Sequence, residues 1–222
     1  MLYPDETFIL DISDVIDSTN TEYQQYLNEN NDIDNAEELA DIMNSLLQAY
    51  DLDHIYIDVG IPFVNAIDWY IQNAMVDGDG DITVMLDPTS IDGYWGPKTF
   101  KYVLLKTFEH EDIHMRQRDR MGEEKYNTLP SGYMKGVALM KKTGNQQDMK
   151  RLYFRDPQEL MAHGHDLFRE IERSANPDVV LRNPELYREE LPTYDKHRAV
   201  FPANAKPLRR LLSYAARYYC SG

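Results

Sequence analysis

The spacing of apolar residues changes along the chain, and this change limits the fold more than any other feature of the sequence. Short alternating, β-branched segments predict strands at 54–59 and 82–86. Apolar residues spaced by three and four predict helices at 36–50, 62–76, 98–121, 157–174 and 206–219, with a further helical part around 134–142. A small early sheet followed by helices is typical of the α+β class.

Glycine and proline residues give the expected ends of several elements. Gly122 stands just after the helix at 98–121, where a left-handed residue ends many helices. Pro157 can occupy the first turn of the helix at 157–174. We therefore expect an α+β domain over 1–174, whose first 53 residues form a helical or irregular lead-in. A basic tail over 175–222 is expected to be mostly irregular before its final helix, because prolines punctuate it.

Charged residues are divided unequally along the sequence. Residues 1–97 contain 21 Asp or Glu and no Lys or Arg, whereas residues 98–222 contain all 23 basic residues against 17 acidic ones. Because phosphates are bound by Lys and Arg, we do not expect nucleic acid to bind through residues 1–97. The acidic half is expected to face the basic half of its own chain or a basic partner, and DNA mimicry is a third interpretation.

Several classes of protein are excluded by what the sequence lacks. It has no apolar run of about 18 residues, so no membrane-spanning helix is expected. The first residues do not have the pattern of a signal peptide. The single cysteine, Cys220, permits neither a disulfide framework nor a thiolate zinc cluster within one chain. The expected location is the cytoplasm of a bacterial host or a virion.

The predicted helix at 98–121 contains the residues His110–His114 (HEDIH), which have the form H-E-x-x-H. Residues four apart lie on one face of a helix, so His110 and His114 can both reach one metal ion. Glu111 can take a proton from a metal-activated water. The apolar stripe that precedes the motif favours this interpretation over a solvated helix face.

A third ligand is expected from the helix that begins at Pro157. Catalytic zinc has three protein ligands, and Glu159 and His163 are four residues apart, so both can face the site. Glu159 is the first candidate. His163 either replaces Glu159 as the ligand or orients a ligand from outside the first coordination sphere.

Taken together, these residues resemble the zincin metallopeptidases that use two histidines and a glutamate as ligands. The resemblance covers roughly 80–172 and includes a strand before the motif helix. His114, Gln117 and Gly122 resemble the H-x-x-Q…G continuation in small bacterial and phage zincin-like proteins. The segment 157–162 (PQELMA) resembles their second-helix signature, although His163 stands where the thermolysin type often has an acidic residue.

The resemblance implies a zinc-dependent metallopeptidase that hydrolyses peptide bonds with a metal-activated water. It assigns one Zn²⁺ to His110, His114 and Glu159 and makes Glu111 the general base. The fold would be zincin-like, with a small mixed sheet, an H-E-x-x-H helix and a second ligand-bearing helix. A peptide or protein substrate would extend along an edge strand at 82–86. The alternative is a structural protein of a phage virion or its assembly, whose metal site is structural or inactive.

Three further expectations concern single residues. Tyr153 and Tyr133 are candidates for stabilising the oxyanion of a peptide-hydrolysis intermediate, on sequence proximity alone. His197 is expected at the surface because Lys196 and Arg198 flank it. Glu109, which precedes His110, is expected to be solvated.

Overall fold

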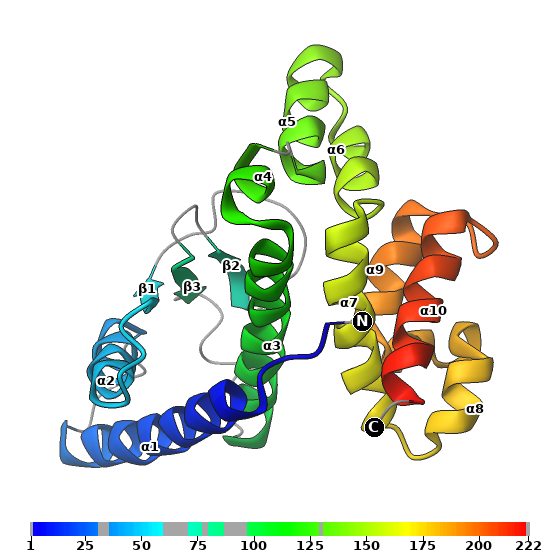
Figure 1. Ribbon diagram of the computed structural model, residues 1–222. Helices are drawn as coiled ribbons and strands as arrows, with labels where there is room; N and C mark the ends of the chain where they lie inside the picture. Colours follow the sequence, from blue (N-terminus) through cyan, green and yellow to red (C-terminus); the bar gives the residue numbers. More distant parts are fainter. Residues whose placement is uncertain are drawn as a thin grey trace. The chain divides into compact units, whose positions relative to one another are not determined.

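The computed structural model describes residues 2–30, 36–59, 71–76, 80–86, 97–128 and 131–220. Within these residues the chain is mostly helical and has a small mixed sheet (Figure 1). The predicted α+β class is confirmed at this level. The chain divides into two compact units, Met1–Arg116 and Gln117–Gly222. The predicted domain boundary after residue 174 stays a prediction. In the described residues no helix has the length and apolar character needed to cross a membrane.

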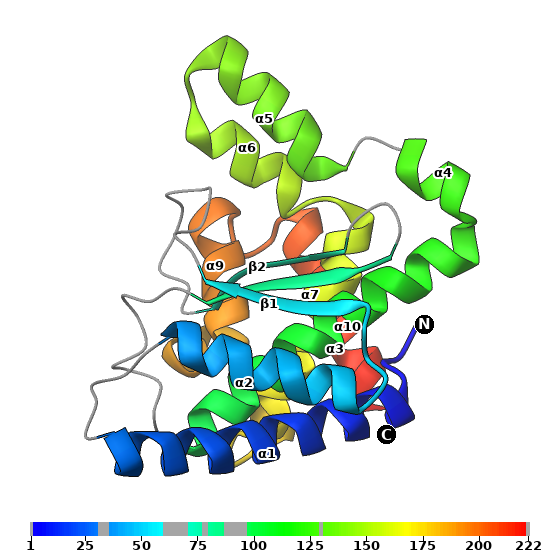
Figure 2. The ribbon, with the colours of Figure 1, turned by 90° about the vertical axis from the view of Figure 1, so that its left-hand side faces the viewer.

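The first unit combines long helices with the sheet. Its elements are α1 (Glu6–Asn30), α2 (Ala36–Ala49), β1 (Ile55–Val59), β2 (Ile71–Val76), β3 (Ile82–Leu86) and most of α3 (Pro97–Met121). In the sheet, β3 lies between β1, which is parallel to it, and β2, which is antiparallel (Figure 2). One buried core joins α1, α2, the sheet and α3, and includes Ile16, Met43, Ile57, Val84, Leu104 and Phe108. This core anchors the half of α3 that precedes the motif.

The outer strand β1 is held by a side chain of α2. Asn44 Nδ2 donates to Ile57 O, and Ile57 N donates to Asn44 Oδ1, both over 2.8 Å. An outer strand exposes unpaired backbone groups, which can pair with another chain. The side-chain amide of Asn44 therefore forms hydrogen bonds with both backbone groups of Ile57 and joins α2 to the sheet.

Two predictions about the sheet are wrong. Residues 71–76 form β2, although the apolar spacing over 62–76 predicted a helix; residues 62–70 of that prediction lie outside the described residues. A register irregularity between Ile71 and Ala74 interrupts the strict alternation of a strand, and this hid the strand from the pattern. The strand at 82–86 exists, but it is central rather than at the edge, because β3 pairs with both β1 and β2.

The second unit is helical throughout its described part. After the last turn of α3 come α4 (Glu123–Thr128), α5 (Gly132–Thr143), α6 (Gln146–Tyr153), α7 (Pro157–Glu172), α8 (Pro177–Arg182), the 3₁₀ helix η2 (Pro184–Glu190), α9 (Pro192–Val200) and α10 (Lys206–Tyr219). Gly122 has φ of +82° after the last residue of α3, so the predicted glycine stop is confirmed. The helices predicted around 134–142, 157–174 and 206–219 are also confirmed.

The expectation of a mostly irregular segment after residue 174 is wrong. Pro177, Pro184 and Pro192 each stand in the first turn of a helix, where the missing N–H of proline costs no hydrogen bond. The prolines therefore begin helices instead of preventing them. The helices α7, α8, α9 and α10 share a second buried core, which includes Leu160, Leu167, Ile171, Val180, Tyr194, Leu208 and Leu211.

The helices α7 and α10 lie side by side in this unit (Figure 1). They are in close contact at Gly164 of α7. A Cβ atom at Gly164 would lie 2.3 Å from the Cβ atom of Tyr214 and 3.5 Å from the backbone nitrogen of Ala215. No real side chain occupies such a short distance, so the absence of a side chain at Gly164 permits this packing.

We expect Gly164→Ala to lower the free energy of unfolding by about 1–3 kcal/mol, the usual cost of overpacking. Alanine is favoured over glycine inside a helix by about 1 kcal/mol, so a net loss would come from the contact with Tyr214. Urea denaturation measures the difference. Ser213→Ala on the exposed face of α10 is the control, with a change within about 0.5 kcal/mol. A Gly164→Ala protein as stable as wild type would contradict this packing.

Candidate metal centre

The motif residues lie on one face of α3. His110, His114 and Gln117 are spaced by four and three residues, which aligns them along a helix. The Nε2 atoms of His110 and His114 are 3.2 Å apart, and their ring centroids are separated by 5.0 Å. The two imidazoles therefore converge, as the H-E-x-x-H spacing predicted. Two imidazole nitrogens at this distance can serve as ligands of the same ion once neither carries a proton there.

The start of the chain is attached to a different face of α3. The backbone nitrogen of Asp5 donates to Asp112 Oδ2 over 2.7 Å, and Arg116 pairs with both carboxylates. Asp5 also caps α1 by accepting from the backbone nitrogens of Thr7 and Phe8, which lowers its pKa. Burial raises the pKa of Asp112, and the contacts with Asp5 and Arg116 oppose that rise. These contacts fix the orientation of α3 about its axis within the first unit.

The carboxylates beside the motif are buried. Glu111 is 6% exposed, which suits a group that must exchange a proton away from bulk water. Glu109 is only 4% exposed, so the expectation that it is solvated is wrong. Glu109 points about 100° away from His110 around the helix. That direction leads to solvent only where no other segment packs against the helix, and the sequence does not show which faces are covered.

The start of α7 is fixed by a cap. Asp156 Oδ1 accepts from the backbone nitrogen of Gln158 over 2.9 Å, and Pro157 occupies the first turn. The other carboxylate oxygen, Asp156 Oδ2, accepts from the backbone nitrogen of Gly132 over 2.6 Å and so holds the start of α5. Glu159 therefore lies in a well-defined first turn, and His163 follows one turn later on the same face.

Two glutamine contacts join the end of α3 to the first turn of α7. Gln117 Nε2 donates to the carbonyl oxygen of Gln158 over 3.1 Å, and Gln158 Nε2 lies 3.4 Å from the sulfur of Met121. Gln117 continues the helix face of His110 and His114, and Gln158 immediately precedes Glu159. From the sequence, Gln117 was only part of a resemblance. Its contact with Gln158 explains why a glutamine three residues after His114 suits this fold.

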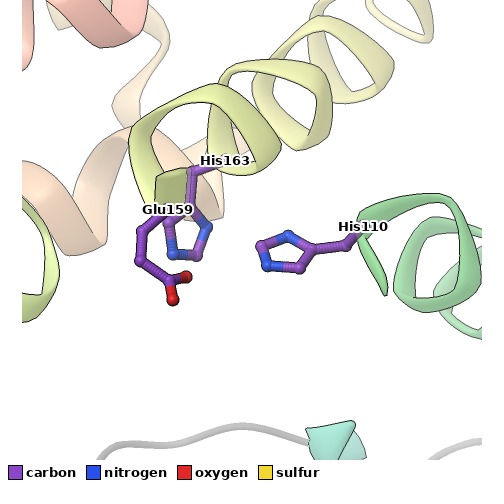
Figure 3. Close-up of side chains that lie close together, drawn as sticks. All are labelled: His110, Glu159 and His163. Carbon is purple, nitrogen blue, oxygen red and sulfur yellow. The ribbon is translucent and has the colours of Figure 1, made fainter. Parts of the chain in front are cut away.

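Three residues of these two helices offer atoms that a metal ion can bind. They are His110 on α3 in the first unit, and Glu159 and His163 on α7 in the second (Figure 3). Figure 3 shows Glu159 and His163 side by side on α7. His114 is outside this group of three, although its Nε2 is 3.2 Å from that of His110.

His163 is enclosed by an acidic residue and several rings. Its Nδ1 lies 3.2 Å from Asp166 Oδ2, and the side chains of both residues are buried. Its ring centroid is 5.7 Å from that of Tyr153, 5.6 Å from that of Phe154 and 5.1 Å from that of His197. Tyr153, the predicted oxyanion stabiliser, is therefore beside His163, and its catalytic role stays a prediction. The side chain of Tyr133 is outside the part of the chain that the structure describes.

His197 is buried completely, so the expectation of a surface position is wrong. Its Nδ1 lies 2.9 Å from the carbonyl oxygen of Thr193 in the same helix, and its buried Nε2 atom has no hydrogen-bond partner among the residues that the structure describes. Burial, together with the nearby His163, lowers the pKa of His197 to about 3. The sequence missed this because flanking residues on a helix point about 100° away, so Lys196 and Arg198 do not report on His197.

Asp166 and His197 lie beside His163, and neither was given a role in the site from the sequence. Asp166 had a usable signal, because an acidic residue three positions after a histidine on a helix can reach its ring. His197 had none, since it comes from a separate helix, α9. Comparisons of the chain with protein-family models, with curated proteins and with solved structures found no match.

Proposed function

We propose that this protein is a zinc-dependent metallopeptidase that hydrolyses peptide bonds. His110, His114 and Glu159 hold the ion, and Glu111 is the general base. The observation that carries the proposal is the convergence of two ligand atoms in the first unit: the His110 and His114 Nε2 atoms are 3.2 Å apart, and the carboxylate that follows His110 is buried.

The chemistry of these donors fits a zinc ion. Imidazole nitrogens and a carboxylate oxygen are the ligands of catalytic zinc in many hydrolases, and His₂Glu is one of the established sets. The same set accepts other divalent ions, although oxygen-seeking Mg²⁺ and Ca²⁺ are disfavoured by two imidazoles. When bound, a zinc ion would supply a Lewis acid that polarises the substrate carbonyl and acidifies water.

The residues of the chain then carry the proton transfer. Glu111 follows His110 directly, and its buried carboxylate accepts the proton of the attacking water and returns it to the leaving amine. Tyr153, which lies beside the His163 ring, is the candidate donor to the oxyanion. An extended substrate cannot pair with the central strand β3, so among the described strands β2 is our candidate for its edge partner.

A chelator experiment tests the proposal. Treatment with a zinc chelator should lower cleavage of an unstructured protein substrate at least about 100-fold, because the Lewis acid contributes several kcal/mol to the transition state. Adding Zn²⁺ back should restore the rate. The control is the same chelator already saturated with Zn²⁺. Cleavage that persists after complete metal removal, or no cleavage by the zinc-loaded protein, would contradict a metallopeptidase.

A second candidate function is structural: a zincin-like component of a larger assembly, such as a phage particle, with a metal that stabilises the fold. The fourth donor, His163, favours it, since structural zinc sites have four protein ligands. So does the charge of residues 1–116, with 24 acidic and 4 basic side chains, which suits a basic partner. Co-sedimentation with a particle would support this candidate, and a monomer that cleaves substrate would count against it.

A further inference from the structure

His163 and Asp166 are arranged like a metal-binding histidine and the carboxylate that orients its ring. Both residues belong to α7, three positions apart, and His163 Nδ1 lies 3.2 Å from Asp166 Oδ2. The side chains are 3% and 8% exposed, so this contact is shielded from competition by water. A carboxylate at this distance accepts a hydrogen bond from Nδ1–H, which favours the tautomer of a neutral imidazole whose proton is on Nδ1.

The consequence concerns the other ring nitrogen. With the proton on Nδ1, the lone pair of His163 is on Nε2, which is the form that binds a metal ion. Histidines that bind metals nearly always donate their remaining N–H to a carboxylate, a carbonyl oxygen or a water. His163 also lies on the face of α7 that carries the proposed ligand Glu159, one turn earlier.

The orientation of the ring is restricted as well. Tyr153 and His197 meet it edge to face, at interplanar angles of 84° and 80°, and Phe154 lies against it at 44°. Rings on several sides leave the imidazole little freedom to turn, and a pre-oriented ligand loses less conformational entropy when it binds. Neither a solvated histidine nor one that only fills the core needs both this enclosure and a buried carboxylate.

We propose that His163 is itself a metal ligand through Nε2, and that Asp166 is the positioning residue that holds it in this form. The inference rests on the proposed metal site and extends its donor set beyond His110, His114 and Glu159. Four protein donors are one more than catalytic zinc sites have and equal the number in structural sites. Whether His163 binds therefore decides whether a coordination position would remain for water.

Metal affinity measured on the full chain tests this inference. Zn²⁺ competition with a chromophoric chelator gives the dissociation constant for wild type and for Asp166→Asn, His163→Ala and the double variant. We expect Asp166→Asn to weaken binding about 10- to 100-fold, because asparagine can offer its NH₂ to Nδ1 and favour the opposite tautomer. His163→Ala should weaken it at least as much. Glu172→Gln, which removes an exposed carboxylate from the same helix, should change nothing.

The double variant separates positioning from a general structural effect. If Asp166 acts through His163, then Asp166→Asn should weaken binding no further once His163 is alanine. The Co²⁺-loaded wild type should also have a visible absorption spectrum that changes on His163→Ala and in the same direction on Asp166→Asn. Affinity of Asp166→Asn within twofold of wild type, or equal losses in both backgrounds, would overturn the inference.

A measurement on wild type covers the case in which these variants do not fold. Nitrogen NMR of the metal-free protein should give His163 an Nδ1 that carries the proton and an unprotonated Nε2; the opposite tautomer would overturn the inference. Wild type that binds no stoichiometric metal would overturn the inference and the proposed function together. Wild type that binds metal with no contribution from His163 or Asp166 would overturn the inference alone.

Discussion

Replacing Glu111 with Gln is expected to lower peptide-bond hydrolysis at least about 100-fold and to leave the metal content unchanged. General acid–base catalysis typically contributes 10²–10⁴-fold, and a glutamine amide cannot accept the proton of the attacking water. The substitution is nearly isosteric and Glu111 is not one of the proposed ligands, so folding and metal binding should persist. The initial rate of cleavage of an unstructured substrate, normalised to bound zinc, measures the effect.

Glu109→Gln is the matched control for this experiment. Glu109 is on the same helix, is equally buried and loses the same charge, but it lies on the other side of His110, about 200° around the helix from Glu111. We expect it to keep most of the activity. A Glu111→Gln protein with more than about a tenth of the wild-type rate would remove Glu111 from the role of general base, as would equal losses in the two variants.

Acid should destabilise the fold through His197. Its pKa is about 3 in the folded protein and about 6.5 in the unfolded chain. Between these values the unfolded chain binds one more proton, so the free energy of unfolding falls as the pH drops below about 6.5. This single group should contribute a loss of about 1 kcal/mol per pH unit, or about 3 kcal/mol by pH 4.

Urea denaturation of wild type and His197→Gln at several pH values between 7 and 4 isolates this contribution. Glutamine keeps a donor for the carbonyl oxygen of Thr193 but cannot titrate, so the stability difference between the two proteins should shrink by about 3 kcal/mol on acidification. Ser213→Ala, a surface change in α10, should follow wild type at every pH. Parallel pH profiles for wild type and His197→Gln would show that His197 is not held neutral by burial.

Much of the helical framework could be predicted from the sequence because its signals are local. The spacing that predicted the motif helix, the glycine at 122 that ends it and the proline at 157 that begins α7 all act within a few residues. The same locality allowed His110 and His114 to be placed on one face. Their Nε2 separation of 3.2 Å follows from that spacing.

What could not be predicted depends on contacts between distant segments. The position of β3 in the centre of the sheet is set by its pairing with both β1 and β2, and the irregularity in β2 disguised the strand itself. The prolines after residue 174 were ambiguous, because proline both prevents and begins helices. Burial of His197 follows from which face of α9 is covered, and no local pattern reports that.

The candidate site divides in the same way. The H-E-x-x-H spacing and the pair Glu159 and His163 could be read directly, because each pair lies four residues apart on one helix. The sequence left open whether Glu159 or His163 is the third ligand. The contact between His163 and Asp166 supports our proposal that both Glu159 and His163 are ligands, because a carboxylate beside Nδ1 favours the tautomer whose Nε2 can bind a metal ion.

The most direct test of the metal centre is the zinc content of the purified full chain by elemental analysis, together with His110→Ala and Glu159→Ala. We predict about one zinc ion per chain in wild type, as one site with two or more imidazoles implies, and a large loss in each variant. Arg169→Ala, a surface change on α7, should keep the wild-type content. Wild type without stoichiometric metal, or variants that retain it, would contradict the metal centre.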